Sequence, residues 1–191
     1  ASDVFCVSVD EVTTEMRSRA KAVNFGILYG QQAFGLGQTL HIPMAEAQEM
    51  IDRYYEAYPK VRSYLDGVVA KAHEDGYATT MFGRKRHIPE LRSSNVNLRH
   101  FGERTAMNHP MQGSAADIIK LAMIQVNKRR REEGLHAHMV LQVHDELDFE
   151  CPLDEADAMA ALVADVMDHV VELKVPLIAD VQTGPNWAIA H

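Results

Sequence analysis

The sequence has few cysteines, one tryptophan and no long apolar run. Its 191 residues include two cysteines, Cys6 and Cys151. Two cysteines cannot form a disulfide framework, and the absence of a Cys-x-x-Cys pair argues against a zinc site, so a reducing compartment is the default. No stretch approaches the ~20 apolar residues of a membrane span, and no N-terminal signal pattern is present. We therefore expect a cytoplasmic protein without a membrane partner.

Positive charge is also scarce, with 19 Lys and Arg against 27 Asp and Glu and a net charge of −8. An even excess of acid would argue against nucleic-acid binding, because such proteins need cations to displace counterions from phosphates. The charge is uneven, however: residues 1–80 carry net −4, residues 81–131 net +8 and residues 132–191 net −12. The cationic segment indicates an anionic partner. For its last four cations, Lys128 to Arg131, a solvated helix face is an equally good interpretation.

Hydrophobic periodicity and capping residues predict an α+β chain with far more helix than strand. Helices are expected at residues 15–29, 32–40, 43 to 55 or 57, 60–74, 94–133 (interrupted near His109-Pro110) and 154–173. Strands are expected at residues 77–81 and 85–88, at 138–143 and 146–151 around a very short turn, and at 175–181.

One predicted helix carries cations and aromatic rings on the same face. Arg17, Lys21, Phe25 and Tyr29 follow one another at intervals of four, so they form a stripe roughly 18 Å long. Because Arg and Lys bind phosphates and flat rings contact a sugar or base, the stripe suits a nucleotide. Gly26 costs this helix roughly 1 kcal/mol relative to Ala, which close approach of a ligand or a hinge would explain. The alternative is an ordinary amphipathic helix with aromatic residues in the core and solvated cations.

Five segments, in chain order, carry a resemblance to a known family. Arg17 to Gly30, with Lys21 and Asn-Phe-Gly, resembles the motif B fingers helix of family A DNA polymerases, the class of bacterial DNA polymerase I. Phe82-Gly83-Arg84-Lys85-Arg86 resembles the Phe-Gly-Arg-x-Arg hairpin of that family, and Glu103-Arg104 with Asn108-x-Pro110-x-Gln112-Gly113 resembles its Arg/Asn/Gln helix. Gln142-Val-His144-Asp145-Glu146 resembles motif C, and Gly184-Pro-Asn-Trp187 resembles the C-terminal Gly-x-x-Trp. The resemblance covers essentially the whole chain.

This resemblance implies a fold and an activity. It implies a helical fingers subdomain at residues 1–100 and the distal part of a palm at residues 101–191, with the motif C hairpin in a short antiparallel sheet. The implied activity is template-directed DNA synthesis in replication and repair, by nucleotidyl transfer from dNTP to a primer 3′-hydroxyl. Primer-template DNA and dNTP are the implied partners, and the oligomeric state stays open.

The resemblance also implies residue roles. Arg17 and Lys21 would bind the triphosphate, Phe25 would stack near the sugar, and Tyr29 would hold the place of the template base. Lys21 is the candidate proton donor to the pyrophosphate leaving group, and it joins Asp145 and Glu146 as the expected catalytic residues. The expected DNA contacts are Gly30, Arg84, Arg86, Arg104, Asn108, Gln112 and His144.

The motif C segment indicates a metal site. Met139, Leu141 and Val143 on one strand, with Leu147 and Phe149 on the other, can bury one face and leave the carboxylates of the turn outside the sheet. A carboxylate on a rigid turn is a good ligand for Mg²⁺, which prefers oxygen donors in fixed geometry.

The resemblance implies two Mg²⁺ ions in the complete enzyme, with Asp145 as the metal ligand from motif C. The second carboxylate would come from motif A, an Asp-Tyr-Ser-x-x-Glu segment, and this sequence contains none. We therefore expect the chain to be a C-terminal fragment that is inactive alone.

Two rival interpretations remain. A metal-dependent phosphohydrolase of the His-Asp type would place His144-Asp145 on a helix among other histidine ligands. A non-catalytic helical nucleic-acid-binding module would use the cations between Arg84 and Arg131, but it would leave Asp145 and the stripe unexplained.

Overall fold

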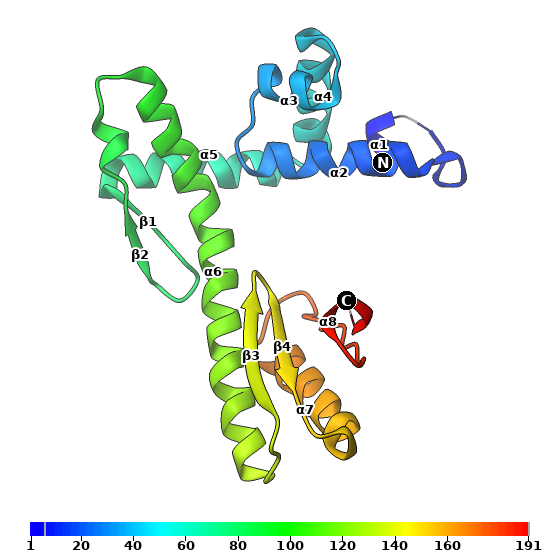
Figure 1. Cartoon of the computed structure of the whole chain (residues 1–191). Coiled ribbons are helices and arrows are strands. Elements are labelled where there is room, and N and C mark those ends of the chain that lie inside the picture. The colour runs from blue at the N-terminus through cyan, green and yellow to red at the C-terminus, as the bar shows by residue number, and fades with distance from the viewer. Residues whose placement is uncertain (6, 191) are drawn as a thin grey trace. The chain divides into compact units, whose positions relative to one another are not determined.

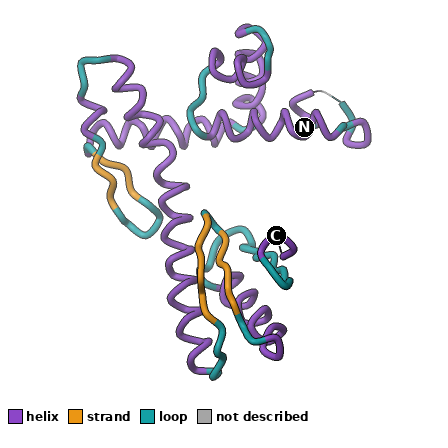
Figure 2. The backbone as a smooth tube through the Cα atoms, viewed as in Figure 1, coloured by secondary structure: helices purple, strands orange, loops and turns teal. Residues whose placement is uncertain are grey.

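The computed structural model describes residues 1–5 and 7–190, so Cys6 lies outside the described residues, and Cys151 is a free thiol. The described chain is mainly helical, with two separate two-stranded antiparallel sheets (Figures 1 and 2), which confirms the predicted α+β class. It divides into two compact units, Ala1–Met111 and the residues from Gln112 onward. The helix α6 (Val96–Glu132) runs from the first unit into the second. No described helix is long and apolar enough to cross a membrane.

The first unit consists of short and medium helices and one hairpin. Its elements before α6 are α1 (Ser2–Phe5), the 3-10 helix η1 (Val9–Glu11), α2 (Thr14–Leu28), α3 (Ala33–Leu40), α4 (Met44–Ala57), α5 (Pro59–Asp75), β1 (Tyr77–Thr79), β2 (Lys85–His87) and the 3-10 helix η2 (Pro89–Arg92). The backbone N–H of Met16 donates to the Thr13 hydroxyl, which caps the start of α2. The helices and hairpin predicted up to residue 88 are therefore all present, with ends shifted by a few residues.

Two apolar clusters hold the first unit together. Val23 and Ile27 of α2 are fully buried against Leu36 of α3 and Ala47 and Met50 of α4. The spacing of Val23 and Ile27 places both side chains on one helix face, so the opposite face of α2 is left for solvent. A second cluster lies beneath the β1–β2 hairpin, and its members are Ala72, Ala78, Ile88, Leu91 and Ala106.

The second unit packs one hairpin and one helix against the end of α6. Its elements are β3 (His138–Val143), β4 (Glu146–Glu150), the 3-10 helix η3 (Leu153–Glu155), α7 (Ala156–His169) and α8 (Trp187–Ala190). Val126 of α6 and Ala137 are buried against Met159, Leu162 and Val166 of α7. Met139 and Phe149, which are cross-strand partners, add their half-buried side chains to this cluster. The core therefore lies beneath the sheet and leaves the β3–β4 turn at its edge.

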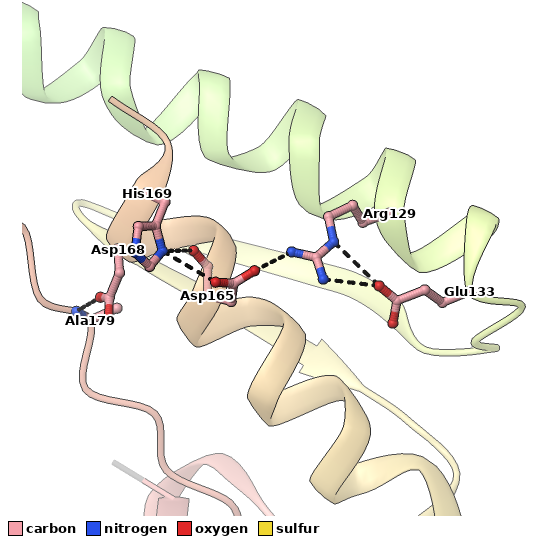
Figure 3. A network of polar contacts seen from close by, with 6 residues as sticks. All are labelled: Arg129, Glu133, Asp165, Asp168, His169 and Ala179. Carbon is pink, nitrogen blue, oxygen red and sulfur yellow. Dashed lines mark hydrogen bonds and ion pairs between the residues drawn. The ribbon is translucent and has the colours of Figure 1, made fainter. Parts of the chain in front are cut away.

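Two arginine side chains near the end of α6 bind neighbouring segments, and Figure 3 shows one of them, Arg129. The Arg129 guanidinium donates to Asp165 of α7 and, over 3.0 Å, to Glu133. The hydrogen bond from Arg129 is the main cause of a lowered pKa at Asp165. Arg130 donates to the Leu135 carbonyl over 3.0 Å. The Lys128 Nζ also lies 3.8 Å from the Glu132 Oε1. Three of the four cations in the Lys128–Arg131 group therefore contact groups within the fold, which favours the helix-face interpretation.

The structure corrects the predicted interruption of the long helix. Pro110 lies inside α6, and the helix continues through it. Proline removes one backbone N–H donor and crowds the preceding turn, which is why an interruption was expected. Ala106, His109 and Ser114 are buried around this point, so side-chain packing offsets the lost hydrogen bond.

Three expectations for the second unit are also wrong. The final helix is shorter than 154–173, because residues 153–155 form η3 and α7 ends at His169. Residues 175–181 form no strand, although apolar and polar residues alternate there as they do in a strand. Neither described sheet offers hydrogen-bond partners to the backbone of this segment, and the Ile178 side chain is 79% exposed. Leu141 is exposed rather than buried, because the register shifts between Met139 and Leu141, and such a bulge re-aims the side chains that follow it.

Candidate functional site

The cation and aromatic stripe of α2 is exposed along its whole length. Arg17 and Lys21 are exposed, and the Phe25 and Tyr29 side chains are 46% and 41% accessible. The two rings stack with their centroids 5.9 Å apart at an interplanar angle of 27°. The Lys21 Nζ lies 5.9 Å from the Phe25 ring centroid. The aromatic residues are therefore not core residues, and the ordinary amphipathic interpretation fails for this helix.

The structure explains Gly26 without a ligand or a hinge. A Cβ atom at Gly26 would lie 2.3 Å from the Gln31 Oε1, so the glycine makes room for that side chain. The Gln31 backbone N–H donates to the Gly26 carbonyl over 2.8 Å, and its Nε2 donates to the Thr39 hydroxyl over 3.0 Å. Gln31 thus fastens the end of α2 to α3, next to Tyr29.

Gly30 ends the stripe and brings α2 against α6. Its φ of +73° is the left-handed conformation that favours glycine after a helix. A Cβ atom there would lie 2.9 Å from the Met107 Sδ and 3.1 Å from the Arg104 Cγ. Two of the predicted DNA contacts, Gly30 and Arg104, are therefore neighbours. Among the described residues, the Arg104 guanidinium has no ion-pair partner.

The other predicted DNA contacts of the first unit lie on the hairpin and on α6. Arg84 and Arg86 are exposed at the β1–β2 hairpin. The His109 Nε2 lies 3.4 Å from the Arg84 carbonyl oxygen, which connects the hairpin to α6. The Asn108 Oδ1 is buried and has no hydrogen-bond partner within the described chain.

The motif C segment forms a tight turn between β3 and β4. Val143 pairs with Glu146, so His144 and Asp145 form the turn, and His144 has a φ of +53°. The Gln142 Nε2 donates to the His144 carbonyl over 2.6 Å, which fastens the turn from inside. His144 and Asp145 are exposed, while Glu146 is half-buried. Gln112, at the start of the second unit, is also exposed.

The turn offers oxygen donors of the type that a hard cation prefers, but too few of them to hold the ion alone. Asp145 and Glu146 supply carboxylate oxygens, the ligands that Mg²⁺ prefers. Among the described residues, however, no three Asp, Glu, His or Cys side chains are grouped closely enough to hold a metal ion. The position of His144-Asp145 in a β-turn also contradicts the phosphohydrolase interpretation, which needs this pair on a helix.

Comparison with known proteins decides the family. The model of DNA polymerase family A matches residues 1–189. The chain belongs to DNA polymerase family A. Among this family, DNA polymerase I of Geobacillus stearothermophilus is 51% identical over 187 residues, and that of Bacillus subtilis is 52% identical over 187 residues. Each alignment covers 98% of this chain and 21% of the relative, so the chain spans about a fifth of those proteins' length.

A solved structure is similar over most of the chain. It is the POL domain of Pol1 from M. smegmatis in complex with DNA primer-template and dNTP, and it matches with a TM-score of 0.88 and 46% identity. The match covers 92% of this chain and 31% of that chain.

Sequence reasoning missed several residues that support the polymerase motifs. Gln31 packs against Gly26 near the end of α2, and His109 contacts the hairpin. The Trp187 Nε1 donates to the Glu146 Oε1 over 3.0 Å. The sequence motif Gly-x-x-Trp includes Trp187 but does not indicate what the side chain contacts. Trp187 and Glu146 are 41 residues apart, so no local pattern predicts their hydrogen bond.

Proposed function

We propose that this chain provides the nucleotide-binding helix and the motif C carboxylates of a Mg²⁺-dependent, template-directed DNA polymerase. In this proposal residues 1–100 are the fingers, and residues 101–191 are the distal palm. Support comes from family membership and from the M. smegmatis relative, whose structure contains primer-template and dNTP. The reaction is nucleotidyl transfer from dNTP to a primer 3′-hydroxyl.

The observation that carries this proposal is the exposed stripe of α2. Lys21 and Arg17 would bind the triphosphate, since cations and phosphate oxygens form charge-assisted hydrogen bonds. Phe25, stacked on Tyr29, offers its face to the sugar, and Tyr29 beside Gly30 would hold the place of the template base. Lys21 would donate a proton to the pyrophosphate as negative charge develops on it.

The carboxylates of the turn would serve the metal. Asp145 would be the metal ligand from this chain, with Glu146 beside it, and a motif A carboxylate outside this sequence would complete the set. When bound, two Mg²⁺ ions lower the pKa of the attacking hydroxyl and neutralise charge on the leaving pyrophosphate. The protein's own part is to hold the acids on a rigid turn.

The remaining polar residues would hold the primer-template. Arg84, Arg86 and Arg104 would bind its phosphates, which gives the +8 segment a role despite the net charge of −8. Gln112 and His144, with help from Asn108, would donate to minor-groove acceptors that all base pairs share. Such contacts test base-pair geometry without reading sequence.

Replacement of Lys21 tests this proposal. In the full-length protein that carries this chain, Lys21→Ala should lower kcat/KM for dNTP by about 100-fold, because a phosphate contact and a proton donor are both lost. The Kd for primer-template should change by less than about twofold, since this contact is to the nucleotide. Lys60→Ala, an exposed lysine on α5, is the matched control and should leave both values unchanged. Equal loss of dNTP use and DNA binding would contradict the assigned role.

A further inference from the structure

The C-terminal segment contacts the acidic turn through one side chain. Trp187 begins α8, and its indole Nε1 donates to the Glu146 Oε1 over 3.0 Å at the start of β4. Both residues belong to the second unit. Glu146 follows Asp145 directly, so this hydrogen bond reaches the carboxylate next to the proposed metal ligand.

The fold of the segment holds Trp187 in place. A Cβ atom at Gly184 would lie 3.1 Å from the Ala190 backbone nitrogen, so the glycine lets the chain fold back on itself. The Asn186 carbonyl accepts the backbone N–H groups of Ile189 and Ala190, both over 3.1 Å. Gly184 and Asn186 thus shape a compact loop that carries the indole to the turn.

We propose that Trp187 is a positioning residue that orients the Glu146 carboxylate through this hydrogen bond. A free Glu side chain samples many rotamers, and a hydrogen bond to one of its oxygens limits them. The indole N–H is a neutral donor, so it orients the carboxylate without adding a positive charge. The hydrogen bond therefore sets the geometry of one acid and adds no charge of its own to the turn. The relevance to catalysis rests on the proposed function, but the contact itself does not.

The contact can be tested in this 191-residue chain, because Trp187 is its single tryptophan and its fluorescence belongs to one site. Glu146→Ala removes the acceptor and should shift the wavelength of maximum tryptophan emission. Glu150→Ala, an exposed acid at the other end of β4, is the matched control and should leave that wavelength unchanged. An unchanged emission maximum in Glu146→Ala would overturn the proposal.

The functional part can be tested by a double-mutant cycle in the full-length protein. Trp187→Phe should raise the Mg²⁺ concentration for half-maximal primer extension by about 3- to 10-fold, the effect of one hydrogen bond, with KM for dNTP within about twofold. In the Glu146→Ala background the hydrogen bond to Glu146 is already absent, so Trp187→Phe should cause no further change in the Mg²⁺ requirement. Trp187→His, which keeps a ring N–H, should recover part of the loss.

These measurements separate the two proposals. If Trp187→Phe raises the Mg²⁺ requirement equally with and without Glu146, the tryptophan contributes only through packing, and the positioning role is overturned. A full-length protein that extends no primer would refute the proposed function, while the emission measurement would still decide the contact. If Trp187→Phe does not fold, Gly184→Ala displaces the indole less drastically, and its effect should likewise vanish in the Glu146→Ala background.

Discussion

Asp145 is the residue on which the proposed chemistry depends most. It is exposed at a turn that is fastened by the Gln142 amide, and it offers a carboxylate to solvent. Asp145→Asn keeps the size of the side chain but removes the charge that a divalent cation needs. In the full-length protein we expect a loss of kcat of at least about 1000-fold, of the order seen when a key electrostatic group is removed. The rate of primer extension at saturating Mg²⁺ and dNTP measures this loss of kcat.

The control for this substitution is also in the second unit. Asp154 is exposed in η3, outside the turn, and Asp154→Asn should leave primer extension unchanged. Gel-shift measurement of primer-template binding should show Asp145→Asn close to wild type. Retention of most activity by Asp145→Asn would contradict its assignment as a metal ligand.

At the scale of elements, ionised carboxylates hold α7 to its neighbours. Asp165 of α7 accepts from Arg129 of α6 and lies near His169, while Asp168 accepts from the Ala179 backbone N–H over 2.6 Å (Figure 3). Glu155, just before α7, accepts from the His136 backbone N–H and lies 2.7 Å from the His136 Nδ1. Hydrogen bonds from Arg129 and from His136 are the main causes of lowered pKa values at Asp165 and Glu155, respectively.

These lowered pKa values predict how stability depends on pH. A carboxyl group whose pKa is depressed by folding contributes stability above its ordinary pKa, near 4, and that stability is lost as the pH falls through the depressed value. Asp165→Asn should therefore lower the free energy of unfolding at pH 7, and the difference from wild type should shrink as the solution is made strongly acidic. Urea titration followed by Trp187 fluorescence measures this for the second unit.

A suitable control for the pH experiment is Glu172→Gln. Glu172 is exposed beyond the end of α7 and has no ion-pair partner among the described residues. Its substitution should leave the pH dependence unchanged. A stability difference for Asp165→Asn that persists undiminished in strong acid would contradict the role of its ionised form.

At the scale of the whole molecule, the chain matches only part of the length of its relatives. It spans 21% of the length of its Geobacillus relative and contains no motif A segment. Because the two-metal reaction needs carboxylates from more than one segment, the isolated 191-residue polypeptide should not extend a primer at an appreciable rate. A Mg²⁺-dependent primer-extension assay with the wild-type full-length protein as positive control checks this. Robust synthesis by the isolated chain would contradict it.

The sequence by itself determined the family, the helical content and the stripe of α2. Fixed helical spacing places Arg17 and Tyr29 on one face, so the stripe follows from residue positions alone. The family follows from the order of the five motifs along the chain. The domain boundary at residues 100 and 101 and the roles of the site residues stay predictions. Local signals were misleading at Pro110, where the helix continues among buried neighbours. They were also misleading at residues 175–181, which alternate like a strand but have no partner strand in the described part of the chain.

Only the tertiary structure decided which side chains support the motifs. Gln31 fills the space above Gly26, His109 reaches the Arg84 carbonyl, and Trp187 donates to Glu146. These contacts join residues from different elements, and a linear pattern holds no information about which loop folds back on which turn. Periodicity reports how a residue relates to its own helix or strand. Packing and hydrogen bonding between elements decide what that residue finally touches.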